Sequence, residues 1–151
     1  MTSTNLDVLL PTAEEFAQKV ALAEAEEASK RGRERAKADA EKKALLETLS
    51  KPSGVSDEEG IRRAIKIIER AVKNGLTEVQ VYRFPNQLCT DRGRAINQIE
   101  KGWENTLTGV PKEIYLLWDK YFRSRGYKLR AEIVDFPGGV PGDIAMTLSW
   151  G

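Results

Sequence analysis

Residues 82–97 read YRFPNQLCTDRGRAIN, and this stretch decides how we interpret the fold. The apolar residues up to Phe84 are typical of the end of a strand, and Pro85 ends it. The residues that follow suit a turn and the first turns of a helix. The same stretch contains the single cysteine, Cys89, together with a threonine, an aspartate and two arginines. Polar groups therefore gather directly after a strand.

A second predicted strand also ends with a Phe-Pro pair, about fifty residues later. Residues 135–143 read DFPGGVPGD, again with Phe followed by Pro. In open α/β sheets, ligands bind beyond the carboxyl ends of the strands. If both strands leave the sheet at the same edge, loops 85–94 and 136–143 face each other. We predict that any ligand site lies between them.

The facing loops favour a small molecule or an anion such as a phosphate. Free backbone amides at a helix N-terminus suit an anion, and arginines add charge partners. Glycines let the backbone approach a ligand closely. Three acids would also suffice in principle for a magnesium ion held with waters, although we assign no metal and no cofactor. The candidate ligand-binding residues are Thr90, Asp91, Arg92, Arg94, Asp135, Gly138, Gly139 and Asp143.

Purely structural roles are the alternative for the same residues. Thr90 and Asp91 are ordinary helix N-cap residues, and Asp143 can accept hydrogen bonds from turn amides. The glycines can serve only the loop geometry. The two Phe-Pro pairs can likewise reflect packing under the sheet edge.

Cys89 is a possible reactive thiol, because a thiolate at a helix N-terminus has a lowered pKa. A phosphatase loop has five residues between its cysteine and arginine, whereas four separate Cys89 from Arg94. The spacing therefore argues against that chemistry. The alternative is a buried, inert cysteine that behaves as a small core residue.

The composition restricts the possible chemistry. The chain has 151 residues, no histidine and one cysteine, with 24 basic and 23 acidic residues for a net charge of +1. The lack of histidine excludes Ser/His and Cys/His nucleophile pairs and most transition-metal sites. One cysteine excludes an internal disulfide. We assign no catalytic residue, lean toward a protein that is not an enzyme, and expect a cytoplasmic location.

Residues 13–49 predict one long charged helix. Thr12 and Glu15 form a capping-box pattern, and no proline follows until Pro52. Large apolar residues occur only near the two ends, so a helix of roughly 55 Å would be mostly solvated. Lys51–Gly54 is a linker. We therefore divide the chain into a helical extension with its linker, 1–54, and a compact domain, 55–151.

The long helix is the expected contact for a protein partner or for self-association. Its segment 30–37 holds five basic residues and one acidic residue, a local charge of +4 that could contact phosphates. Acidic residues directly upstream and the lack of interleaved aromatics argue against nucleic-acid binding. The sequence contains no run of about twenty apolar residues, so we expect no membrane span.

The compact domain reads as helix, strand, helix, helix, strand, strand. The expected helices cover residues 57–74, about 89–100 and 110–124, and the expected strands cover 78–84, 128–136 and 144–150. In the first strand, we place Val79 and Val81 on one face and Tyr82 and Phe84 on the other. Strands two and three should pair antiparallel, and strands one and two should run parallel. The fold class is α/β (or α+β): a small mixed three-stranded sheet packed by about three helices and preceded by the long helix.

Together these features predict a non-enzymatic cytoplasmic α/β module that mediates protein interaction or self-association. The alternative is a small-molecule or anion-binding protein or enzyme that uses loops 85–94 and 136–143.

Overall fold

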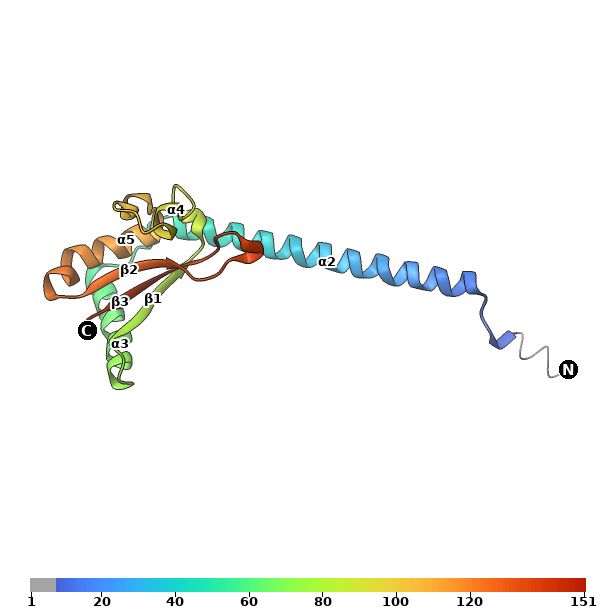
Figure 1. Cartoon of the computed structure of the whole chain (residues 1–151), viewed down its shortest axis with the longest axis horizontal. Coiled ribbons are helices and arrows are strands. Elements are labelled where there is room, and N and C mark those ends of the chain that lie inside the picture. Colours follow the sequence, from blue (N-terminus) through green and yellow to red (C-terminus); the bar gives the residue numbers. More distant parts are fainter. Residues whose placement is uncertain (1–7) are drawn as a thin grey trace. The chain divides into compact units, whose positions relative to one another are not determined.

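A computed structural model describes residues 8–151 of the chain (Figure 1). The chain divides into two units, Met1–Lys43 and Ala44–Gly151. The expected extension 1–54 begins before Val8, and that part lies outside the described residues. Within the described range, no helix combines the length and the apolar composition needed to cross a membrane.

The long N-terminal helix is confirmed as α2, Ala13–Ser50. Its capping box forms as expected: the Glu15 amide donates to Thr12 Oγ1 at 3.1 Å, and the Thr12 amide donates to Glu15 Oε2 at 3.3 Å. The helix continues through Gly32, and none of its residues is buried. The helix is divided between the two units: residues up to Lys43 belong to the first, and the last turns, from Ala44, belong to the second.

The second unit contains a three-stranded sheet with the order β1-β3-β2, where β1 is Glu78–Phe84, β2 is Lys128–Ile133 and β3 is Ile144–Ser149. The predicted antiparallel pairing of the last two strands is confirmed. β1 also pairs antiparallel with β3, so β1 and β2 run in the same direction but do not pair. Every pairing in the sheet is therefore antiparallel, because β3 lies between β1 and β2.

A register shift between Gln80 and Tyr82 corrects the predicted faces of β1. Tyr82 and Phe84 pair with Met146 and Ile144, and Val79 pairs with Leu148. These three partners alternate along β3 and therefore share one face of the sheet. Val81, at the bulge, joins the same core cluster. The two-face prediction was wrong because a bulge inserts one residue and reverses the alternation after it.

The opposite face of the sheet is polar. It carries Glu78 and Arg83 of β1 and Arg130 of β2, all of them exposed. Glu78 and Arg130 form an ion pair across β3, and the hydrogen bond from Arg130 lowers the pKa of Glu78. The sheet thus has one apolar face and one charged face, as antiparallel sheets often do.

The two main helices of this unit form near their predicted positions. α3, Asp57–Lys73, is capped by Ser56, whose side chain accepts from the Glu59 amide. α5, Gly109–Leu117, continues as a π-helical segment, Trp118–Phe122, and a 3₁₀ turn, Arg123–Arg125. Gly126, with φ of 92°, ends this helical segment.

The predictions were too long at three other elements. The helix expected over about 89–100 is only α4, Arg94–Asn97, because Gly93 before it has φ of 85° and Ile99 after it has φ of 54°. Neither conformation continues a helix. The strand expected to reach residue 136 ends at Ile133, and the last strand ends at Ser149 instead of residue 150.

The core lies between the apolar sheet face and the segments that follow β1. Its buried members are Phe84, Leu88, Cys89, Ile96, Leu107, Ile144 and Met146. Leu46 and Leu49, on the last turns of α2, pack against it. Gly109 makes this contact possible, since a Cβ there would lie 2.1 Å from the Leu49 carbonyl oxygen. The C-terminal turns of α2 are therefore part of the compact unit.

We predict that Gly109→Ala destabilises this unit more than Gly126→Ala does. Both glycines have positive φ, 57° and 92°, so each alanine incurs about 1–2 kcal/mol of backbone strain. Only the Cβ at position 109 meets other atoms within 4 Å, and such overpacking costs about 1–3 kcal/mol in addition. Urea unfolding of both variants measures the difference. Equal losses would contradict the packing of α2 against Gly109.

Candidate functional site

The two predicted loops do contact each other. The side-chain amide of Asn86 donates to the carbonyl oxygen of Pro141 at 2.7 Å, and Asn86 is buried. Gly93 brings the first loop onto the sheet edge, because a Cβ there would lie 3.1 Å from the side chains of Ile133 and Ile144. Asn86 was not among the predicted site residues. The residue that joins the loops thus has a structural role.

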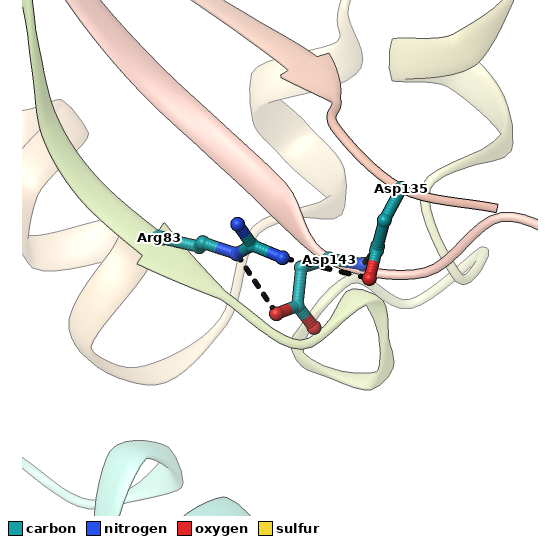
Figure 2. Close-up of polar contacts among 3 residues, drawn as sticks. All are labelled: Arg83, Asp135 and Asp143. Atoms are coloured by element: carbon teal, nitrogen blue, oxygen red, sulfur yellow. Dashed lines mark hydrogen bonds and ion pairs between the residues drawn. The ribbon is translucent and has the colours of Figure 1, made fainter. Parts of the chain in front are cut away.

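The acids of the second loop pair with a cation that the sequence analysis did not select. Figure 2 shows the side chain of Arg83, on β1, extending toward both Asp143 and Asp135. Its guanidinium lies 3.0 Å from the Asp143 carboxylate and 3.5 Å from the Asp135 carboxylate. Asp135 also accepts a hydrogen bond from the Asp143 amide. All three side chains are about half exposed. Arg83 could have been found from its place on the polar face, next to the first Phe-Pro pair.

The first loop uses its polar groups internally. The carboxylate of Asp91 accepts from the amides of Gly93 and Ala95 at 2.9 and 2.8 Å. Arg94 is strongly exposed and lies 3.8 Å from Glu100. The amides expected to bind an anion thus already have an acceptor. For Asp91, the geometry favours the structural role that the sequence left open.

The remaining predicted residues are divided between the two loops. Thr90 hydrogen-bonds through its backbone to Thr106, and Arg92 is exposed with φ of 58°. Gly138 and Gly139 have φ of 63° and 79° in a short turn, with open space where a Cβ would stand. Their backbone conformation is therefore sufficient to explain these two glycines.

Gly142 has a steric reason to be glycine. A Cβ at this position would lie 2.2 Å from the Asp135 carboxylate. Its amide donates to the Asp135 carbonyl oxygen, so the chain doubles back at this point. Among residues 8–151, no group of three or more acidic, cysteine or histidine side chains is placed to hold a metal ion. The contacts of Asp135 with Gly142 and Asp143 therefore favour a structural role in the loop over ligand binding.

Cys89 is buried, with 2% of its surface exposed. It forms an isolated bridge with Leu107 and does not begin a helix. Burial raises the pKa of its thiol to about 11, and the hydrogen bond with Thr106 offsets only part of this effect. The thiol is therefore protonated near neutral pH. This environment favours the inert core cysteine over the reactive thiol.

We predict that Asp135→Ala destabilises the protein by about 1–2 kcal/mol, because the Asp143 amide loses its acceptor. Asp135→Asn keeps an oxygen in place and loses only a half-exposed ion pair, so it should cost less than about 1 kcal/mol. Asp143→Asn is the matched control for loss of charge beside Arg83. Urea unfolding ranks the three variants. Equal costs for Ala and Asn at position 135 would show that charge, and not the loop hydrogen bond, dominates.

The second unit also contains a concave feature away from these residues. It is a cleft of about 670 Å³ between α3, α5 with its π-helical continuation, and the apolar face of the sheet. Its floor includes Val81, Tyr82, Leu129 and Leu148. This volume is in the range of pockets for small ligands. The sequence analysis did not predict it.

Small residues on α3 help to form the cleft. Gly60 and Ala64 line it, together with the larger Ile67. At Gly60, α3 approaches α5 so closely that a Cβ would lie 2.9 Å from the side chain of Leu117. In contrast, Ile65 and Val72 on the same helix are 42% and 54% exposed. The sequence signal that could have indicated this cleft is the presence of Gly60 and Ala64 among the isoleucines of α3.

The polar groups of the cleft are mostly paired with one another. Glu113 accepts from the amide and the hydroxyl of Ser53, and Lys120 lies 3.5 Å from Asp57. Desolvation, followed by the negative charge of Glu113, raises the pKa of Tyr82. The cleft is thus an apolar surface with a few charges at its mouth.

Comparison of the chain with protein-family models, with curated proteins and with solved structures gives no match. The chemistry of both sites is therefore argued from their own residues. The loop edge offers paired charges, and the cleft offers apolar surface.

Proposed function

We propose that this protein is a non-enzymatic cytoplasmic module that binds a protein partner through helix α2. The observation that carries the proposal is the exposure of this helix: none of its 38 residues is buried. In proteins, most helical stability comes from packing an apolar face against another surface. A partner would supply that surface to α2.

Large apolar side chains near the start of α2 support this proposal. Phe16, Val20 and Leu22 are 49%, 57% and 64% exposed. Single exposed apolar residues are common, but Phe16 and Val20 are one turn apart on the same face and form a usable contact, while Leu22 lies on another face. The non-enzymatic part of the proposal is supported by the protonated thiol of Cys89 and by the internal pairing of the loop acids.

The test compares the full chain with a form that lacks residues 1–43. The deletion keeps Leu46 and Leu49, which belong to the core, so the remaining unit should fold. We expect the full chain to associate, with itself or with a protein captured from extract, and the deleted form to lose this association. Light scattering measures self-association, and affinity capture with both forms measures other partners.

A milder variant controls for the deletion. Phe16→Glu, Val20→Glu and Leu22→Glu together keep the helix and remove its large apolar contacts, so a contact with a different protein at this end should be lost. Circular dichroism confirms that the helix content is unchanged. If the deleted form keeps every association of the full chain, α2 is only an extension and the proposal fails.

The cleft supports a second candidate function, the binding of a small apolar molecule. Its volume of about 670 Å³ and its lining by three apolar surfaces favour such a ligand. This candidate replaces the loop edge as the best place for a small molecule. It does not depend on α2.

We predict that the dye 1-anilinonaphthalene-8-sulfonate binds the folded protein in this cleft. Ala64→Phe should fill the space and reduce the fluorescence enhancement several-fold, whereas Lys66→Phe, exposed on the same helix and outside the cleft, should leave it unchanged. Fluorescence titration measures both, and unfolding curves confirm that the variants are folded. Equal dye binding by the two variants would place the dye elsewhere.

A further inference from the structure

The charges of α2 are separated along the helix. Its middle changes from acidic to basic within a few residues, without a large apolar side chain between the two clusters. The acidic cluster is Glu24, Glu26 and Glu27, and the basic cluster is Lys30, Arg31, Arg33 and Arg35. Glu34 is the one acid within the basic cluster.

These charges are available to a partner. All of them are exposed. None of the ion pairs found among residues 8–151 uses a side chain of α2. The helix therefore presents an acidic and a basic cluster on its exposed surface.

We infer that the partner of α2 is a second copy of this chain, with the two α2 helices packed side by side and antiparallel. This inference rests on the proposed function and names its partner. The argument is charge complementarity: an antiparallel pair centred between Ala28 and Ser29 places each acidic cluster beside the basic cluster of the other copy. A parallel pair in the same register would place each cluster beside its own like charges.

The helical repeat defines which charges meet. At 100° per residue, Glu24 lies on one flank of the contact and Glu26 on the other, whereas Glu27 and Lys30 lie on the far side of the helix. The antiparallel register brings Glu24 beside Arg31 and Arg35 of the second copy. It brings Glu26 beside Arg33 of the second copy. Both flanks are thus complementary in one register.

The same register explains the small side chains in the middle of α2. Ala21, Ala25, Ala28, Gly32 and Ala36 lie on one helical face about 80° wide, between the two charged flanks. In the antiparallel pair, Ala21 faces Ala36 of the second copy, and Ala25 faces Gly32. Small residues permit a close approach of the helices. The contact is two-fold symmetric, as in most homodimers.

The charges set orientation more than affinity, because each exposed ion pair contributes little. We therefore expect a reversible dimer that weakens as salt screens the charges. Phe16 and Val20 lie outside this face. Replacing them leaves the dimer intact, while a different protein bound at the start of α2 would be lost.

Disulfide trapping in the full chain tests the orientation. Cys89 is buried, so single cysteines introduced as Ala21→Cys and Ala36→Cys are the accessible thiols. In the antiparallel dimer, two copies of Ala21→Cys hold their thiols about 22 Å apart. A disulfide spans a Cα–Cα distance of about 7 Å at most. Each variant alone should therefore stay unlinked, and an equal mixture should form the linked unlike pair, identified by peptide mass spectrometry.

A charge exchange gives an independent readout. Glu24→Lys, Glu26→Lys and Glu27→Lys together should lower the dimer affinity by about tenfold or more through like-charge contacts. Adding Lys30→Glu, Arg31→Glu, Arg33→Glu and Arg35→Glu to the same chain should restore it. Sedimentation at low and high salt measures both variants, with circular dichroism as the check on helix content.

The possible failures are distinguishable. Linkage within each single-cysteine variant would show a parallel pair and overturn the inference, while the proposed function would stand. A single copy at every concentration would also overturn it, and capture of a different protein that depends on residues 1–43 would still support the proposed function. A dimer that persists after deletion of residues 1–43 would overturn the inference, because α2 would not be its contact.

Discussion

The compact unit depends on the double pairing of β3. This strand comes last in the sequence, yet it is the central strand of the sheet and hydrogen-bonds to both neighbours. Residues Ile144 to Leu148 are all buried, so both of its faces are covered. Before β3 is in place, β1 and β2 have no strand partner within the described chain. The sheet is therefore complete only when β3 has paired with both of them.

The polar edge follows from this central strand. Because β1 and β2 are both antiparallel to β3, they run in the same direction and end at the same edge. The β2–β3 loop returns beside the end of β1, where Arg83 meets Asp135 and Asp143. Half-exposed pairs of this kind contribute modestly to stability. Their main effect is to set the path of the loop, which the hydrogen bond from the Asp143 amide to the Asp135 carboxylate also fixes.

The two units present different kinds of surface. The second unit buries an apolar core and leaves a cleft beside α3, whereas residues 13–43 of α2 have no buried side chain. The middle of α2 carries charged clusters and small residues, with its large apolar residues only near the ends. It suits a partner of the same kind, whose charges are arranged in the opposite order. A second copy in reverse orientation meets this requirement.

Local features of this protein followed from its sequence alone. The capping box at Thr12 and the approximate positions of the main strands and helices depend on neighbouring residues and on helical or strand periodicity. The order of charges along α2 is also a property of the sequence alone. Only the tertiary structure decided the central position of β3, the bulge that turns Val81 and Tyr82 to one face, the burial of Cys89 and the cleft. It also gave Asp135 and Asp143 their partner, Arg83, more than fifty residues away. Each of these depends on which distant segments meet, and periodicity carries no information about that.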